Sequence, residues 1–280
     1  MINLKGGVGK TTITVALAEF LTLEYHKKVL VIDLDPQTNA TVSLMKDKEW
    51  RKKDEQGETL LQLFKDKIDD TDKFDLDKTI VKGVSNIDGG INNLHLLPSS
   101  LGFIEIQDSL STTHGKFHLQ SPVKILKKSI SDKLKHYDIV LIDCPPSLGI
   151  VTLNGLLISD YYLIPCTPTV LSTYGIPQII SHIKLFSDES EHKVDPLGIV
   201  ITMYRSGIIN YDIEVKRIRN KSSTKDYPRT FDAVIPMAVK ASDATNIEST
   251  SSKLQKKYSS SKLYEQYDAL TKEFLRYLEL

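Results

Sequence analysis

The sequence predicts an α/β fold, a mainly parallel sheet with helices on both of its faces. Short, continuous apolar runs such as Val29–Ile32 recur along the chain and are typical of strands buried on both faces. Segments with apolar residues at helical spacing separate these runs, as expected for alternating strands and helices. A glycine-rich loop between the first strand and the first helix is the third observation.

In chain order, we expect Met1–Leu4 to end a short first strand and Thr11–Leu23 to form the first helix. Later strands are expected at Val29–Ile32, Leu94–Leu97, Ile139–Ile142, Tyr162–Pro165 and Leu197–Met203. Later helices are expected at Val123–Leu134, Thr152–Ile158, Pro177–Phe186, Tyr211–Arg219 and Lys262–Leu278. Only four residues precede the glycine loop, whereas a strand usually has about five or six. Either the first strand is short or the start of the protein lies upstream.

The chain of 280 residues is expected to form a single domain, 1–280, with a C-terminal helix at about 262–278. Residues 46–93 are charged and less regular, and we interpret them as an insertion with one short helix at Thr59–Lys67. No apolar run is long enough to span a membrane. The two cysteines, Cys144 and Cys166, indicate a reducing cytoplasm and predict buried thiols without a disulfide framework.

The glycine-rich loop predicts a phosphate-binding site. Glycines let backbone N–H groups approach a phosphate, and the helix that follows adds its N-terminal dipole. Lys10 would contact the β and γ phosphates, and the Thr11 hydroxyl would bind Mg²⁺. Leu4 replaces the usual first glycine and Lys5 follows it; Lys5 could neutralise charge at the γ-phosphate or be a solvated surface lysine. The candidate nucleotide-binding residues are Gly6, Gly7, Val8, Gly9, Lys10, Thr11 and Thr12.

Three carboxylates follow the predicted strands. Asp33 and Asp35 come at the end of the Val29–Ile32 strand, and Asp143 at the end of Ile139–Ile142. The carboxyl ends of parallel strands meet at the ligand edge of the sheet, where acids would repel a nucleotide unless a cation intervened. We therefore predict Mg²⁺ near Thr11, Asp33 and Asp143, with Asp143 as the Walker B acid. Asp33 would order the Mg²⁺ shell or the loop, and helix capping is the alternative for these acids.

Together, Lys5–Thr12, Asp33–Gln37 and Asp143–Ser147 resemble the deviant Walker A ATPases of the ParA/Soj partition type. Further matching segments follow in the family's order: Leu96–Ser99, Thr152–Asn154, Tyr162–Pro165, Thr202–Tyr204 and Ile235–Pro236. The resemblance covers nearly the whole chain, and regions 46–93 and 205–230 match least. It implies the P-loop NTPase fold.

The resemblance also implies a slow, Mg²⁺-dependent hydrolysis of ATP within a sandwich homodimer. In that dimer, Lys5 of each subunit would reach the other subunit's phosphates, and Asn154 would lie near the same interface. Asp35 would position the attacking water, so the candidate catalytic residues are Lys5, Lys10 and Asp35. The adenine base is expected near Met203, Tyr204, Pro236 and Met237.

The family's partition role implies that the ATP-bound dimer binds DNA without sequence specificity, in the cytoplasm on the nucleoid. A ParB-like or adaptor protein would stimulate hydrolysis and release. The chain carries 36 basic and 36 acidic side chains, but residues 215–257 hold ten Lys/Arg and only four acids. Such a region can bind phosphates, and a solvated basic face is the alternative. The candidate DNA contacts are Lys216, Arg217, Arg219, Lys221, Lys240, Lys253, Lys256 and Lys257.

Two other uses of the same ATPase are weighed. Min-type relatives act at membranes through a basic amphipathic helix, but the last helix here is net acidic, so we expect it to pack onto the domain. Redox or metal-delivery relatives hold a cluster with cysteines, and this chain has no Cys-x-x-Cys pair. No helix-turn-helix domain fits before the loop, so sequence-specific operator binding is not expected unless upstream sequence is missing. The cargo, whether plasmid, chromosome or protein assembly, stays open.

Overall fold

The strands form two hydrogen-bonded sheets in this computed structural model, which describes residues 1–106, 122–238, 246–258 and 261–280. The first sheet has the order β2-β3-β1-β4 and the second β5-β6-β7. Within the described residues, all neighbouring strands are parallel except β2 and β3. The strands are β1 (Val29–Asp33), β2 (Val81–Lys82), β3 (Leu94–Leu97), β4 (Ile139–Asp143), β5 (Tyr161–Cys166), β6 (Asp195–Tyr204) and β7 (Thr230–Pro236).

The first residues of the chain lie between the two sheets. The amide of Ile2 donates to the carbonyl of Leu163 in β5 at 3.0 Å, and the amide of Cys144, just after β4, donates to the carbonyl of Met1 at 3.3 Å. These few bonds do not form a regular ladder, so the prediction of a strand at Met1–Leu4 was wrong. The segment nevertheless joins the sheets and places the glycine loop at the centre of their carboxyl edge.

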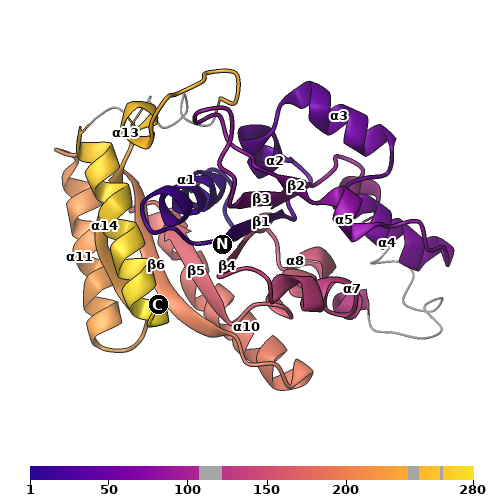
Figure 1. Cartoon of the computed structure of the whole chain (residues 1–280). Helices are drawn as coiled ribbons and strands as arrows, with labels where there is room; N and C mark the ends of the chain where they lie inside the picture. Colours follow the sequence, from indigo (N-terminus) through magenta and orange to yellow (C-terminus); the bar gives the residue numbers. More distant parts are fainter. Residues whose placement is uncertain (107–121, 239–245, 259–260) are drawn as a thin grey trace.

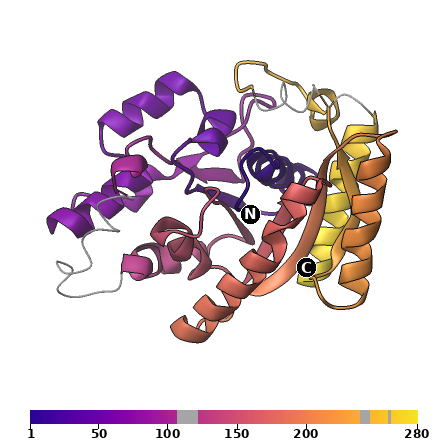
Figure 2. The same cartoon turned by 180° about the vertical axis from the view of Figure 1, so that it is seen from behind.

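The helices cover both faces of the sheets, as predicted (Figures 1 and 2). One face is covered by α1 and α14, and the other by α4, α7, α8, α10 and α11. The helices of the amino-terminal part are α1 (Lys10–Leu23), α2 (Asn39–Leu44), α3 (Asp47–Glu55), α4 (Leu60–Asp69) and α5 (Leu76–Thr79). They are followed by the 3-10 helix η1 (Pro122–Lys124), α7 (Ile125–Leu134), α8 (Ile150–Leu156), α9 (Val170–Thr173), α10 (Gly175–Ser190), α11 (Ile209–Ser223), α13 (Leu254–Lys257) and α14 (Ser261–Leu278).

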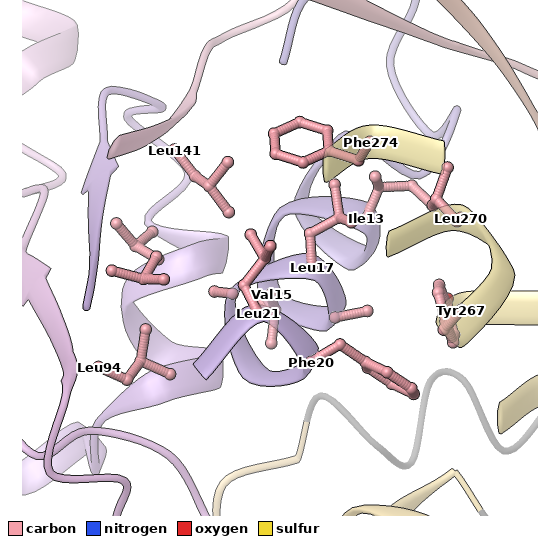
Figure 3. Packing of buried hydrophobic residues seen from close by; sticks show 14 of the residues in the cluster. Ile13, Val15, Leu17, Phe20, Leu21, Leu94, Leu141, Tyr267, Leu270 and Phe274 are labelled. Carbon is pink, nitrogen blue, oxygen red and sulfur yellow. The ribbon is translucent and has the colours of Figure 1, made fainter. Parts of the chain in front are cut away.

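Helix α1 is the centre of the larger core. Figure 3 shows its side chains packed between the strands and α14, with Phe20 toward Tyr267. Because α1 is covered by the sheet on one side and by α14 on the other, apolar residues occupy most of its circumference. The helix that follows the glycine loop is therefore held rigidly, which fixes the position of its N-terminus.

The predicted strands and helices after residue 10 are confirmed, with boundary shifts of a few residues. Region 46–93 is more regular than predicted, since it holds α3, α5 and β2 besides the expected helix α4. Helix α3 shows no apolar stripe because Trp50 is its one buried residue. Strand β7 was also not predicted.

Helix α14 packs onto the domain through buried apolar side chains, as expected; these are Leu263, Tyr267, Leu270, Phe274 and Leu275. Its polar side chains cover the edge strand β7. The Glu273 carboxylate accepts hydrogen bonds from the amides of Asp232 and Ala233 at 2.7 and 2.8 Å, and Gln266 accepts one from Val234 at 3.0 Å. Within the described residues, no helix is both long and apolar enough to cross a membrane.

Candidate nucleotide and magnesium site

The glycine loop ends at the N-terminus of α1 and is pinned to the second sheet. Gly7 and Gly9 have φ angles of 72° and 83°, in the left-handed region that favours glycine. The Thr202 hydroxyl, on β6, donates a hydrogen bond to the Val8 carbonyl at 2.7 Å. The loop is thus held in shape by a residue almost two hundred positions away, with its backbone gathered around the helix terminus, where an anion is stabilised.

The Lys10 side chain is buried and points back into its own loop. Its Nζ lies 3.4 Å from the carbonyl oxygen of Asn3 and 3.5 Å from that of Lys5. None of the ion pairs found among the described residues involves Lys10. Its ammonium group therefore forms no ion pair with a carboxylate there, although its charge lowers the pKa of the nearby Asp143, and it is placed to interact with phosphates on the concave side of the loop.

Thr11 and Asp143 meet at the carboxyl end of β4. The Thr11 hydroxyl donates to Asp143 Oδ2 at 2.6 Å, and Thr14 lies 3.4 Å from Asp143 Oδ1. Burial raises the pKa of Asp143 to about 6, although its bond with Thr11 opposes that shift. The hydroxyl and carboxylate suit Mg²⁺. No cluster of three His, Cys, Asp or Glu side chains in the described ranges could hold a metal, so nucleotide oxygens would have to complete its coordination.

Asp33 lies beside Asp143 in the register of β1 and β4 and organises the loop that follows β1. Its carboxylate accepts hydrogen bonds from the Asp35 amide at 3.0 Å and from the amide and hydroxyl of Thr41, both at 2.8 Å. Burial, and then the charge of Asp143, raise the pKa of Asp33 to about 8. Of the two roles expected for Asp33, this geometry supports ordering of the loop, and its role as a metal ligand stays a prediction.

Asp35 is largely buried and is held at one carboxylate oxygen. Its Oδ1 accepts a hydrogen bond from the Gln37 amide at 2.9 Å, while Oδ2 has no hydrogen-bond partner among the described residues. The Asp35 carbonyl accepts a bond from the Ser99 hydroxyl at 2.9 Å, and the Ser99 carbonyl accepts one from Trp50 Nε1 at 2.9 Å. Sequence reasoning did not assign a role to Ser99 or Trp50, although Ser99 lies in a segment that matched the family.

The two residues predicted at a dimer interface have different surroundings. Lys5 is exposed, and its Nζ lies 3.2 Å from the hydroxyl of Ser172 in α9. Asn154 is fully buried within its own chain, and its prediction as a residue near the dimer interface stays a prediction. Its side chain accepts a bond from the Leu126 amide at 3.0 Å and donates to the Pro122 carbonyl at 2.8 Å, which ties α8 to η1 and α7.

The residues predicted around adenine come together at the carboxyl ends of β6 and β7. Tyr204 pairs with Pro236 in the sheet, and the Met237 amide donates to the Tyr204 carbonyl at 2.8 Å. Met203 adopts a positive φ of 52°, which is uncommon outside glycine. Thr202, which pins the glycine loop, directly precedes these residues. The candidate base site therefore adjoins the candidate phosphate site.

The predicted DNA-binding residues that the structure describes are distributed over two helices and differ in exposure. Lys216, Arg217, Arg219 and Lys221 lie on α11, Lys253 and Lys256 are exposed at α13, and Lys240 lies outside the described residues. Arg217 pairs with Glu214 at 2.9 Å. Lys257 is buried in an ion pair with Glu19 of α1 at 2.6 Å, so its prediction as a DNA contact was wrong.

Both cysteines are free and buried, as predicted. Burial raises the pKa of Cys144 to about 11 and that of Cys166 to about 12. Such thiols stay protonated near neutral pH and are poor ligands for a metal cluster. Nothing in the described residues thus favours the redox alternative.

A glycine loop at the N-terminus of a helix, with a buried lysine and a Thr–Asp pair at the carboxyl edge of parallel strands, defines a P-loop nucleotide-binding ATPase. A family model, AAA_31, described as an AAA domain, matches residues 1–195. The sporulation initiation inhibitor protein Soj of Bacillus subtilis is 30% identical over 244 residues, which cover 86% of this chain and 85% of Soj. The chain therefore belongs to the ParA/Soj family of partition and positioning ATPases.

Solved structures share the fold. The structure of apo McdA of Cyanothece has a TM-score of 0.74 at 20% identity and covers 98% of this chain and 97% of McdA. A putative plasmid partition protein of Borrelia burgdorferi, bound to AMPPNP, has a TM-score of 0.69 at 21% identity. It covers 98% of this chain and 96% of that protein.

Proposed function

We propose that this protein is an ATP-driven switch that partitions DNA or positions another cargo. Its ATP-bound homodimer binds DNA without sequence specificity, and a ParB-like or adaptor protein stimulates hydrolysis and so triggers release. It acts in the cytoplasm, associated with the nucleoid. The observation that carries the proposal is the placement of two lysines on one loop: Lys10 is buried beneath the loop, whereas Lys5 is exposed outside it.

The division of labour between these lysines follows from their positions. Lys10 of each chain contacts the phosphates bound in that same chain. The Lys5 ammonium lies near α9 and is available to neutralise charge on nucleotide bound by a second copy, because its single side-chain hydrogen bond, 3.2 Å long to Ser172, is worth only about 1 kcal/mol. A site completed in this way hydrolyses ATP only as a dimer, which suits a switch.

The hydrolysis step needs an oriented water molecule and a neutralised γ-phosphate. The free Oδ2 of Asp35 accepts a hydrogen bond from water and aims its oxygen at the γ-phosphorus, and the products are ADP and phosphate. Thr11 and Asp143 would hold Mg²⁺, which would supply positive charge to offset that of the phosphates. Lys5 of the second copy and Lys10 stabilise the remaining charge. The Asp35 carboxylate is a weak base, so a site in which it orients the water is expected to hydrolyse ATP slowly.

The names of the relatives support transport of cargo but not one particular cargo. The curated relatives include a chromosome-partitioning ATPase of Treponema pallidum and the cell division protein PomZ of Myxococcus xanthus, of which this chain covers 57%. A plasmid, a chromosome and a protein assembly are all compatible with the same switch.

Binding to random-sequence duplex DNA tests the proposal. We expect binding with Mg²⁺ and ATP, much weaker binding with ADP or without nucleotide, and lower affinity at the higher of two salt concentrations. Lys10→Ala should abolish both nucleotide binding and DNA binding. Equal binding in all nucleotide states, or binding that ignores salt, would refute the DNA switch. Sedimentation with anionic liposomes in ATP is the parallel assay, and ATP-dependent liposome binding without DNA binding would favour a Min-type role.

A further inference from the structure

Ser99, in the loop that follows β3, joins three segments of the chain through hydrogen bonds. It is fully buried, and each of its polar groups has a partner within the protein. Its amide donates to the hydroxyl oxygen of Thr41 in α2 at 3.0 Å, and its hydroxyl donates to the carbonyl of Asp35 at 2.9 Å. Its carbonyl accepts a bond from Nε1 of Trp50 in α3 at 2.9 Å. A displacement of Ser99 would therefore move the Asp35 loop.

The Asp35 backbone is held from within its own loop and also from Ser99. The Asp35 amide donates to Asp33 Oδ1 at 3.0 Å, and the Asp35 carbonyl accepts a bond from the Thr38 amide at 2.9 Å. Both of these partners are close in sequence and shape the loop locally. The Ser99 hydroxyl attaches the same carbonyl to the end of β3, the strand beside β1. Because Oδ1 is already held by the Gln37 amide, the direction of Oδ2 follows the orientation of the Asp35 backbone.

Trp50 anchors the otherwise exposed helix α3 to Ser99. It is the one buried residue of α3, and its side chain packs into the larger core. Figure 1 shows α3 at the periphery of the molecule, next to α2. The indole N–H restrains the Ser99 carbonyl and with it the backbone from which the Ser99 hydroxyl projects. The groups that hold the Asp35 loop thus include one from region 46–93, the part of the chain that is among the least similar to the family.

We propose that Ser99 and Trp50 are positioning residues for ATP hydrolysis, which together hold the Asp35 loop so that Oδ2 faces the attacking water. This inference rests on the proposed function, in which Asp35 orients that water, and it gives α3 a role in the reaction. Among the described residues, neither side chain bonds to Lys10 or Thr11, so nucleotide binding does not depend on them. A misplacement of about 1 Å can cost about 100-fold in rate, so loss of either bond acts on the hydrolysis step.

The test compares two variants of the full chain, Ser99→Ala and Trp50→Phe, each of which removes one donor and keeps an apolar side chain in its place. The matched control is Ser43→Ala, since Ser43 is a buried serine of α2 whose hydroxyl donates to the Asn39 carbonyl at 2.7 Å, within its own helix. Phosphate release with Mg²⁺ and ATP gives kcat and KM, and urea unfolding gives the stability of each variant. We expect kcat of both variants to fall by about 10- to 100-fold, with KM within about twofold of the wild type. The control should lose a similar amount of stability to Ser99→Ala and keep the wild-type kcat.

A double variant shows whether Ser99 acts through Asp35. Ser99→Ala should lower phosphate release in the otherwise wild-type chain but not in Asp35→Ala, because the carboxylate that Ser99 positions is then already missing. A structural role of Ser99 would lower it in both.

The positioning role is overturned if either Ser99→Ala or Trp50→Phe keeps the wild-type kcat, or if the Ser43→Ala control loses as much kcat as they do. It is also overturned if Ser99→Ala lowers phosphate release by the same factor with and without Asp35. If Asp35→Ala alone releases phosphate as fast as the wild type, the proposed hydrolysis step itself fails, whatever Ser99 and Trp50 do.

Discussion

The ammonium group of Lys5 lies 3.2 Å from the hydroxyl of Ser172 in α9 and outside the phosphate loop of its own chain. Ser172 is buried and also accepts a hydrogen bond from the Thr169 hydroxyl at 2.8 Å, so its position is fixed. The apolar residues beside it are exposed: Val170, Leu171 and Tyr174. In this arrangement Ser172 restrains Lys5 within its own chain, and formation of the proposed homodimer would require release of that bond.

We therefore predict opposite effects of two substitutions. Lys5→Ala should bind ATP through Lys10 but lose ATP-dependent dimerisation and hydrolysis. Ser172→Ala should favour the dimer by up to about fivefold for each of its two copies, because in each copy one hydrogen bond of about 1 kcal/mol no longer competes. Sedimentation velocity with ATP measures the monomer–dimer equilibrium of both variants. Ser131→Ala, a serine on the surface of α7, is the control. A dimer that is weakened by Ser172→Ala would show that Ser172 supports the interface and does not restrain Lys5.

Asp35→Ala should separate ATP binding from ATP hydrolysis. We expect phosphate release to fall at least about 100-fold, because the water loses its orienting carboxylate, while the ATP-bound dimer persists. Trp50 is the sole tryptophan of the chain and contacts the Asp35 loop through Ser99, so its fluorescence should report ATP binding in the variant as in the wild type. Unchanged phosphate release from Asp35→Ala would remove Asp35 from the hydrolysis step.

The buried pair Asp33 and Asp143 predicts a pH dependence of stability without nucleotide. The pKa of Asp33 is raised to about 8 in the folded state, above its unfolded value of 3.8, so between these values the folded protein binds more protons than the unfolded chain. The free energy of unfolding should therefore fall as pH rises from about 6 to 8, by at most about 1.4 kcal/mol per pH unit for one proton.

Urea unfolding in EDTA at several pH values measures this slope. Asp33→Asn should flatten it, whereas the exposed Asp69→Asn should leave it as in the wild type. If Asp33→Asn has the same slope of unfolding free energy against pH as the wild type, then Asp33 does not bind the extra proton of the folded state.

The buried ion pair between Lys257 and Glu19 should be important for stability. Lys257→Met leaves the Glu19 carboxylate buried without its cation and should lower the free energy of unfolding by about 3–5 kcal/mol. Adding Glu19→Gln removes the charge but keeps an acceptor for Ser85 or Tyr258, so the double variant should recover part of the loss. Lys256→Met, on the exposed side of α13, should change the free energy of unfolding by no more than about 0.5 kcal/mol. A similarly small loss for Lys257→Met would contradict the buried pair.

The sequence allowed prediction of those parts of the site that depend on local order. Thr11 follows the glycine loop and Asp143 ends a buried strand, and parallel strands bring their carboxyl ends to one edge, so their meeting could be inferred. The buried strands and most helices could be inferred from their apolar periodicity. Helix α3 could not, because its polar surface hides one buried tryptophan.

Long-range partners were beyond such reasoning. Lys257 belongs to a basic stretch and has no local feature that distinguishes it from the exposed Lys256, yet it meets a carboxylate 238 positions earlier in the chain. Asn154 was placed by resemblance, which gives the order of motifs but not the direction of a side chain.

The edge of β7 has a consequence for how copies of the protein associate. An uncovered edge strand can template the addition of a strand from any neighbouring chain and so seed aggregates. Here Glu273 and Gln266 occupy the amides through which such growth would begin. If the proposed DNA-bound dimer forms, copies crowded on one duplex would therefore not be expected to polymerise through β7, and their contact would depend on the face that carries Lys5.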